Sequence, residues 1–296
     1  QLLAVARLHR STPFDVMHAH WLIPQGIVAA VFRRFSRTAP PFLVTAHGSD
    51  LGTLRGRIAT WVKRRVLGAA SHVSVVSHAL KTDCTALGCS PDKVDVAPMG
   101  VDLQSTFTPP DDGRARRGIV FVGKLARHKG ADTLVEAIGL LRNAHADVPV
   151  EIIGAGAERA TLELRVRELG LDERVQFTGA LPQERVAEQL RSAAIAVTPS
   201  HREGLGLVVV EALGCGCAVV ASDLPAIRDV ITNEATGLLA TPGDAREFAG
   251  NIARLLDDED LRTRLARAGR DHALEHFDWR AVGARYASML GALIRG

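Results

Sequence analysis

The chain has 296 residues, and domains of roughly 100–200 residues are usual, so two domains are expected. Its composition, 47% hydrophobic and 23% charged, is that of a globular protein, and 4% aromatic residues without a recognition motif disfavour a nucleic-acid partner. The longest apolar stretch, "LGLVVVEALGCGCAVVA", is interrupted by Glu211 and falls short of the roughly 20 residues that a membrane helix needs. Four cysteines fit neither a disulfide framework nor a zinc motif, and they are Cys84, Cys89, Cys215 and Cys217.

Positive charge is concentrated in the first part of the chain. Residues 1–117 hold 15 Lys/Arg against 8 Asp/Glu, whereas the remainder holds 21 against 25. These basic residues form either a solvated helix face or a docking site for an anionic membrane surface, and both interpretations stay open. The residues concerned are Arg33, Arg34, Arg37, Arg55, Arg57, Lys63, Arg64 and Arg65.

The elements of the first part alternate between strands and helices. The opening "QLLAVARLHR" has a helical pattern, and "WVKRRVLGAA" and "SHALKTDCTAL" predict two further helices. Predicted strands are "FDVMHAH", "PFLVTAHGSD", "HVSVVSH" and "KVDVAPM". A chain that opens inside a helix and lacks an initiator Met predicts a fragment, with the first domain incomplete.

The alternation of strands and helices starts again after "TPPDDGRARRG". The composition of this segment predicts a linker, with a domain boundary near residue 114. Predicted strands then are "GIVFVG", "VPVEIIG", "RVQFTG", "AAIAVTPS", "CAVVAS" and "TGLLAT", with helices such as "GADTLVEAIGLLRNA" between them. This alternation predicts an α/β protein with two Rossmann-like, doubly wound parallel sheets facing a cleft. The expected parts are a partial acceptor-side domain at 1–114, a ligand-binding domain at 115–277 and a C-terminal helix at 278–296.

Acidic groups and glycines meet in the stretch from Ser200 to Ser222. The turn "HREGLG" follows a strand, so it lies at the carboxyl end where doubly wound sheets bind ligands. Gly204 and Gly206 permit close approach of a ligand, and the next helix begins with free N–H groups that favour phosphate. Glu203 and Glu211 suit the hydroxyls of a sugar or ribose. In the alternative, Glu203 caps the helix and Glu211 pairs with a base. For Glu211 this alternative is disfavoured, because its sequence neighbours are apolar and a buried Glu is rare without a partner.

Basic residues occupy the corresponding place in "FVGKLARHKGADTLVEA". Lys124 and Lys129 flank a glycine turn, and Gly130 opens the next helix. Two lysines beside a strand end and a helix N-terminus can neutralise a diphosphate leaving group. Each lysine alone would be interpreted as a solvent-exposed side chain.

Four motifs occur in a characteristic order across residues 14–222. They are "DVMHAH", "VTAHGSD" with His47, "GKLARHKG" and "EGLGLVVVEA". Together they resemble the motifs of the family-four glycosyltransferases, which are retaining enzymes of the GT-B fold. The resemblance implies transfer of a sugar from a nucleotide-diphosphate donor to a glycan or lipid-linked acceptor, without a cofactor or a metal. It also implies a cytoplasmic enzyme of cell-envelope polysaccharide synthesis, with possible peripheral contact at the inner face of an anionic membrane.

The resemblance assigns roles to individual residues. His47 would lie near the anomeric centre and act in catalysis with Glu203 and Lys129. Lys124 and Lys129 would bind the diphosphate, Glu211 the ribose hydroxyls, and Leu181 the nucleobase. Donor sugar and phosphate would contact Glu203 and the N–H groups of Gly204, Leu205, Gly206 and Leu207.

Two departures from the family pattern are present, and other functions compete. Lys124 stands where the family usually has Arg, and His128 stands where it often has Glu.

The alternatives are a nucleotide-sugar-binding fragment without turnover, or an epimerase or phosphorylase of the same fold. "GAGAER" lacks the third glycine of a dinucleotide fingerprint. His18 and His20 face the same side of a strand, where packing or lining a site is expected rather than metal binding.

Overall fold

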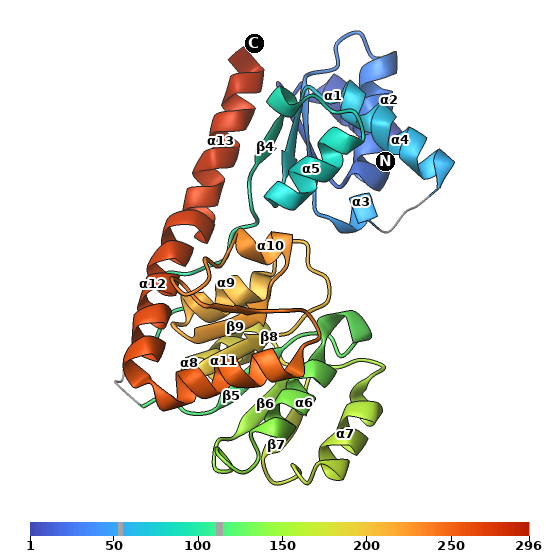
Figure 1. Cartoon of the computed structure of the whole chain (residues 1–296). Coiled ribbons are helices and arrows are strands. Elements are labelled where there is room, and N and C mark those ends of the chain that lie inside the picture. The colour runs from blue at the N-terminus through green and yellow to red at the C-terminus, as the bar shows by residue number, and fades with distance from the viewer. Residues whose placement is uncertain (53–55, 111–114, 296) are drawn as a thin grey trace. The chain divides into compact units, whose positions relative to one another are not determined.

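The computed structural model divides the chain into two compact α/β units (Figure 1). The first unit contains Gln1–Met99 together with the segment that begins at Arg280, and the second contains Gly100–Trp279. The structure describes residues 1–52, 56–110 and 115–295. Within these ranges, no helix is both long enough and apolar enough to cross a membrane.

The junction between the units differs from the boundary predicted near residue 114. That residue lies outside the described ranges, and the segment from Gly100 onward already belongs to the second unit. Leu103 and Phe107 are fully buried, and the Arg270 guanidinium donates to their carbonyl oxygens at 2.8 and 3.0 Å. The linker-like composition begins after Phe107, but the apolar side chains before it pack into the second unit.

The first unit is built on a parallel sheet with the strand order β1-β2-β3-β4. The strands are β1 (Met17–His20), β2 (Phe42–Ala46), β3 (His72–Val75) and β4 (Val94–Val96), which confirms the strands predicted for this part. All of β2 is buried, as expected for a parallel strand that is covered on both faces. Helical segments of this part are α1 (Leu2–Ser11), η1 (Leu22–Gly26), α2 (Ile27–Phe35), α3 (Ser49–Gly52), α4 (Arg57–Ala69), α5 (His78–Ala86) and η2 (Pro91–Lys93).

The C-terminal helix α13 (Trp279–Arg295) contributes to the first unit from Arg280 onward. The Tyr286 hydroxyl donates to the carbonyl of Ala97 at 3.3 Å, and its ring lies 5.3 Å from the His18 ring. This helix therefore contacts the loop after β4 and the side chains of β1.

The second unit is a doubly wound sheet with the strand order β10-β9-β8-β5-β6-β7. All neighbouring pairs are parallel. The order reverses between β5 and β8, which makes the carboxyl ends of these two strands the topological switch point where ligands bind in such sheets. The strands are β5 (Ile119–Val122), β6 (Val150–Ile153), β7 (Val175–Gly179), β8 (Ile195–Thr198), β9 (Ala218–Ser222) and β10 (Leu238–Ala240).

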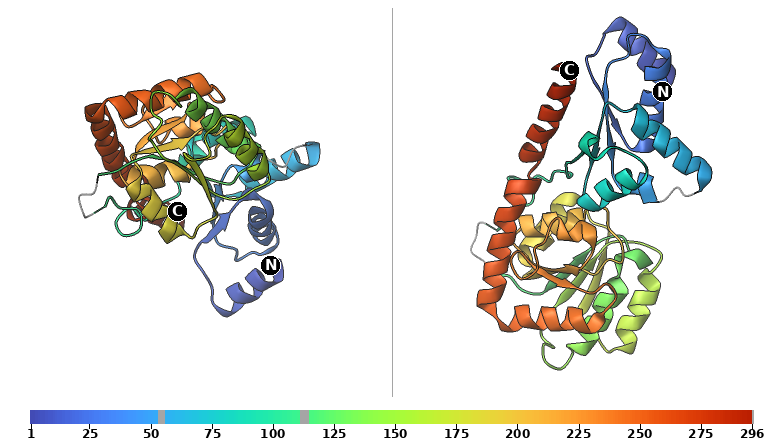
Figure 2. Two further views of the ribbon diagram at one scale, coloured as in Figure 1. Left: turned by 90° about the horizontal axis from the view of Figure 1, so that it is seen from below. Right: turned by 45° about the horizontal axis from the view of Figure 1, so that its top comes forward.

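Helices cover both faces of this second sheet (Figures 1 and 2). On one face α6 packs against α7 and α11, and on the other α9 packs against α8 and α12. Their bounds are η3 (Arg127–Lys129), α6 (Ala131–Leu140), α7 (Arg159–Glu168), α8 (Gln183–Ser192), α9 (Leu207–Gly214), α10 (Pro225–Arg228), α11 (Ala245–Asp257) and α12 (Glu259–Phe277).

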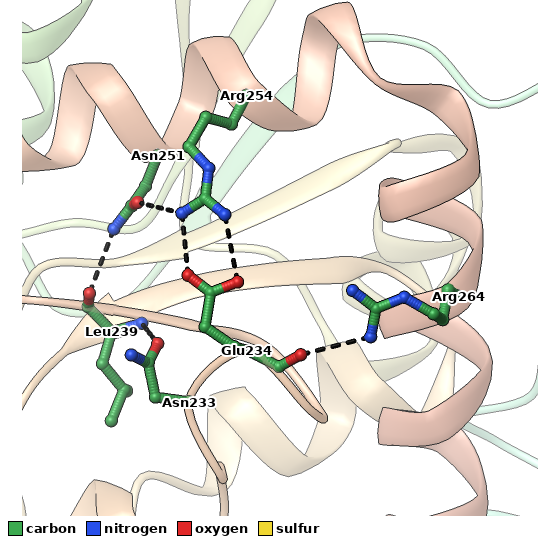
Figure 3. Close-up of polar contacts among 6 residues, drawn as sticks. All are labelled: Asn233, Glu234, Leu239, Asn251, Arg254 and Arg264. Atoms are coloured by element: carbon green, nitrogen blue, oxygen red, sulfur yellow. Dashed lines mark hydrogen bonds and ion pairs between the residues drawn. The ribbon is translucent and has the colours of Figure 1, made fainter.

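The turn before β10 is held by a polar cluster on the outer part of this unit (Figure 3). The Arg254 guanidinium donates to both carboxylate oxygens of Glu234 at 2.9 and 3.0 Å, and Arg264 donates to the Glu234 carbonyl at 3.2 Å. Asn251 donates to the Leu239 carbonyl at 3.0 Å. These contacts tie α11 and α12 to the edge of the sheet, and they have a structural role.

Candidate functional site

The loops after β5 and β8 meet at the switch point of the second unit. The backbone N–H of His201 donates to the His128 carbonyl at 2.9 Å. Gly130 has φ +68°, and a Cβ at this position would lie 1.9 Å from the Pro199 carbonyl oxygen. No other residue type fits at residue 130 without moving backbone, so the glycine permits the two loops to approach.

Lys129 and Glu203 form an ion pair across these loops. Lys129 Nζ lies 2.6 Å from Glu203 Oε1, and the buried Ser200 hydroxyl donates to the same oxygen at 2.7 Å. The Lys129 and Glu203 side chains are only 25% and 11% exposed, so the interaction is weakly screened by solvent. The structure thus brings together two residues that the sequence singled out separately.

The alternative role of Glu203 as a helix cap is wrong. The N-cap of α9 is Gly206, in the left-handed region, and no side chain makes a capping hydrogen bond there. Glu203 Oε1 instead accepts from Lys129 and Ser200. The carboxylate is therefore fixed beside the start of the helix without satisfying the N–H groups of its first turn.

Those N–H groups are available for a ligand. Among the residues that the structure describes, no acceptor is found for the backbone N–H of Gly204, Leu205, Gly206 or Leu207. The partial positive charge of the α9 N-terminus adds to these donors. The segment therefore has the free donors predicted from the sequence, and they lie beside the Lys129–Glu203 pair.

Glu211 lies on α9, one turn past its start as predicted. Burial raises the pKa of its carboxyl from 4.5 to about 7. Within the described part of the chain, no hydrogen bond or ion pair reaches this carboxyl, so the alternative of a basic partner receives no support. Glu211 is half-buried, and an unpartnered carboxyl withdrawn from water is costly, which makes it a candidate for ligand binding.

For two residues that were predicted to bind the donor, the structure shows no contact that supports the prediction. The Lys124 side chain is exposed in the loop after β5 and has no hydrogen bond or ion pair with any described residue. Leu181 is half-buried in the loop between β7 and α8. Their proposed contacts with diphosphate and nucleobase remain predictions.

A second polar cluster lies in the first unit, at the carboxyl ends of β1 and β2. His20 Nδ1 lies 3.0 Å from His47 Nε2, and His18 Nε2 lies 2.7 Å from the Thr45 hydroxyl. The His18 and His20 rings are 4.1 Å apart. The histidines that the sequence placed on one face of a strand are thus joined to His47 by direct contact. No group of three or more His, Cys, Asp or Glu suited to a metal ion occurs in the described ranges.

The imidazoles of this cluster have lowered pKa values, which favours their neutral form. Burial, together with the neighbouring His20 and His47, lowers the pKa of His18 to about 4. Burial also lowers the pKa of His20. The pKa of His47 is lowered by burial and by His20, against an opposing effect of Asp50. These side chains therefore act as hydrogen-bonding groups and not as cations.

Asp50 organises the cluster, and the sequence analysis did not identify it. Its buried carboxylate accepts from the backbone N–H groups of Leu22, His47 and Gly48 at 2.8, 3.1 and 3.0 Å. One side chain thus fixes both the loop that follows β1 and the loop that carries His47. An aspartate three residues after His47, in the first turn of a short helix, was the available signal. Ser200, which follows β8, was missed in the same way.

Two parallel-sheet α/β units, with a polar cluster at the strand ends of each, form the architecture of GT-B glycosyltransferases. The model of the family "Glycosyl transferases group 1" matches residues 113–272, and that of "Glycosyltransferase Family 4" matches residues 1–105. The chain therefore belongs to the group 1 and family 4 glycosyltransferases.

Individual relatives agree with this assignment. The chain is 30% identical to 2-deoxystreptamine glucosyltransferase of Streptomyces kanamyceticus, with 98% of this chain and 81% of the relative covered. It is 31% identical to D-inositol 3-phosphate glycosyltransferase of Frankia alni, with 93% and 73% covered.

Solved structures show the same fold. Sucrose-phosphate synthase from Thermosynechococcus elongatus matches with a TM-score of 0.85 at 27% identity, covering 99% of this chain and 77% of that one. Anabaena HepE in complex with UDP matches with a TM-score of 0.88 at 20% identity, covering 98% and 82%. The predicted α/β class with two parallel sheets is confirmed.

Proposed function

We propose that this glycosyltransferase moves a sugar from a nucleoside-diphosphate sugar to a hydroxyl of a glycan or lipid-linked acceptor, with retention of anomeric configuration. The observation that carries the proposal is the Lys129–Glu203 ion pair at the switch point of the second sheet. The unpartnered Glu211 and the free N–H groups at the start of α9, on the helix that follows the Glu203 loop, would add further donors and acceptors for the same ligand.

The donor would rearrange this ion pair. Its diphosphate would take the place of the Glu203 carboxylate as the partner of Lys129, because a phosphate carries more charge. Lys124 and the N-terminus of α9 would add positive charge to the same group. Glu203, held by Ser200, would then accept hydrogen bonds from sugar hydroxyls, and Glu211 would accept them from the ribose.

The proposed chemistry is front-face substitution at the anomeric carbon. The acceptor oxygen forms a bond to that carbon on the face where the diphosphate departs, the carbon–diphosphate bond breaks, and the acceptor proton passes to a diphosphate oxygen. Lys129 and the α9 N–H groups would stabilise the charge that develops on the leaving group. Neutral His47 would donate a hydrogen bond to the sugar near the reacting carbon. The scheme uses neither a metal nor a cofactor.

The setting proposed for this reaction is the cytoplasm, at the inner face of a membrane, in the synthesis of a cell-envelope glycan. The four cysteines, Cys84, Cys89, Cys215 and Cys217, are free and buried, which suits a reducing compartment. A nucleoside-diphosphate-sugar donor is supported by HepE of the same fold, whose structure was determined with UDP-glucose.

Release of nucleoside diphosphate from UDP-, GDP- and ADP-glucose in the presence of glycan and lipid-linked hydroxyl acceptors, with and without EDTA, tests the proposal. Wild type should release nucleoside diphosphate from one of the three donors, and Lys129→Met should release none. Lys81→Met on α5 should behave as wild type. Product analysis by NMR should show the anomeric configuration of the donor. An inverted product would contradict retention, and loss of activity in EDTA would contradict metal independence. Tight binding without release would favour a nucleotide-sugar-binding protein.

A further inference from the structure

Helix α4 presents an outer face that packs against nothing else in the described structure. Its inner side is anchored by buried Val66 and Leu67, and by Lys63, whose Nζ donates to the Leu51 carbonyl at 2.5 Å. Lys63 is therefore not a surface charge, contrary to the grouping expected from the sequence, and Arg55 lies outside the described residues. The outer face, called the α4 face below, consists of Arg57, Ile58, Trp61, Arg64 and Arg65.

Two large apolar side chains stand out on the α4 face. Ile58 is 81% exposed and Trp61 is 58% exposed. They are three residues apart, so they are neighbours on one side of the helix. The Arg65 guanidinium lies over the Trp61 ring, 5.4 Å from its centroid. The face thus combines an exposed apolar pair with cations that lie directly beside it.

The charge of the surrounding sequence is one-sided. Residues 16–82 contain a single acidic residue, Asp50, and its buried carboxylate accepts from backbone N–H groups of the loops after β1 and β2. Arg57, Arg64 and Arg65 are therefore without a carboxylate of this segment to neutralise them. Helix α2, which packs against α4 (Figure 1), adds exposed Arg34 to the cationic character of this unit.

Helix α7 of the second unit shows what an ordinary exposed helix looks like in the same protein. Leu164 is 50% exposed on it, but Arg165 next to it pairs with Glu136 and Glu168. Charges of both signs alternate there, as on most solvated helices. The contrast makes the α4 face, and not surface arginines in general, the unusual feature.

We propose that the α4 face docks on an anionic lipid bilayer. Trp61 and Ile58 would enter the boundary between headgroups and acyl chains, while the three arginines contact lipid phosphates. Helices that bind a membrane interface combine apolar side chains that enter the headgroup boundary with cations that contact anionic lipid, and the α4 face carries both sets. A purely electrostatic partner would leave Ile58 and Trp61 unexplained. The inference supplies a surface for the membrane contact proposed above, and binding to vesicles can be measured without sugar transfer.

Co-sedimentation with vesicles tests the proposal on the whole chain. One set contains phosphatidylcholine alone and the other contains phosphatidylcholine with 30% phosphatidylglycerol. Wild type should partition onto the anionic set only. Ile58→Ser/Trp61→Ser should weaken this binding at least tenfold, and Arg64→Glu/Arg65→Glu should weaken it by more than about 25-fold, since each basic residue contributes roughly fivefold. The matched controls Leu164→Ser and Arg167→Glu on α7 should stay within twofold of wild type.

Fluorescence gives a second readout that does not depend on disruptive variants. Brominated phosphatidylglycerol should quench wild-type tryptophan emission, and the conservative Trp61→Phe should lose most of that quenching while still binding. Equal binding to neutral and anionic vesicles, no binding to either, or unchanged binding of both double variants would overturn the proposal. Catalytic failure with intact vesicle binding would contradict only the transfer reaction.

Discussion

The two polar clusters differ in charge although both lie at the carboxyl ends of parallel strands. The cluster of the second unit is built from full charges, Lys129 and Glu203, and is followed along the chain by helix α9 with the carboxyl of Glu211. The cluster of the first unit joins neutral imidazoles, among them His20 and His47. Only the former can neutralise a phosphate at pH 7, whereas the latter can give and accept hydrogen bonds without attracting anions. Under the proposed function, the charged cluster binds the donor and the neutral cluster positions groups at the reacting carbon.

Removing the cation of the charged cluster should have the largest effect. Lys129→Met takes away the charge that would stabilise the leaving diphosphate and leaves the nearly buried Glu203 carboxylate without its cation. We expect kcat/KM to fall by about 10³-fold, measured as release of nucleoside diphosphate. Lys81→Met is the matched control. Activity within tenfold of wild type would show that the ion pair is structural only.

Changing the neutral cluster should lower turnover without weakening donor binding. His47→Ala is expected to reduce kcat by about 10²-fold, while the Kd for nucleotide stays within twofold. His276→Ala, at the C-terminal end of α12 where the side chain is 41% exposed, is the control. Because burial lowers the pKa of His18 and His47, acid protonates these groups more readily in the unfolded chain. The contribution of these two imidazoles to the free energy of unfolding should therefore fall as the pH drops below 6.5, and for His18 down to about 4. Equal losses in kcat and nucleotide affinity would contradict the division between clusters.

Replacing Glu211 should have opposite effects on nucleotide binding and on the free energy of unfolding. Its pKa of about 7 lies above the ordinary 4.5, so the folded chain holds a proton that the unfolded chain releases. The contribution of Glu211 to the free energy of unfolding should thus decrease from pH 4.5 to 7 and level off above, seen as the difference between wild type and Glu211→Gln. Glu211→Gln should add about 3 kcal/mol of stability at pH 8 and little at pH 4, and weaken nucleotide binding about tenfold. Urea unfolding measures the stability and calorimetric titration measures the nucleotide affinity. A loss of stability in Glu211→Gln at pH 8 would mean that the Glu211 carboxylate has a stabilising partner in the folded chain.

The smallest expected effect concerns the hydroxyl that holds Glu203. Ser200→Ala removes one hydrogen bond to Oε1 and leaves Lys129 in place. We expect kcat/KM to fall about fivefold, with no change in the nucleoside diphosphate Kd. Ser192→Ala, at the end of α8, serves as the control. A loss as large as that of Lys129→Met would mean that Ser200 itself contacts the donor.

The sequence was informative where local pattern decides the structure. Alternating strands and helices, the glycine turns and the helical position of Glu211 could all be predicted because each depends on neighbouring residues. Contacts between distant segments could not. Lys129 and Glu203 are 74 residues apart and meet only because the strand order reverses between β5 and β8.

The sequence also did not predict which individual side chains are buried. Lys63 looked like one more surface base but lies inside the first unit. Leu103 and Phe107 precede a linker-like composition yet are core residues of the second unit. In each case tertiary packing, which a local window does not contain, determined the outcome.

The central claim is that the charged cluster of the second unit binds a nucleoside diphosphate. Calorimetric titration of the chain with UDP, GDP and ADP tests it most directly, with Lys129→Ala and Glu211→Ala as disabled variants and Lys81→Ala as the control. The account predicts selective binding of one nucleotide by wild type and by the control, and loss of that binding in both disabled variants. Unchanged affinity in the disabled variants, or no binding of any nucleotide by folded wild type, would contradict it.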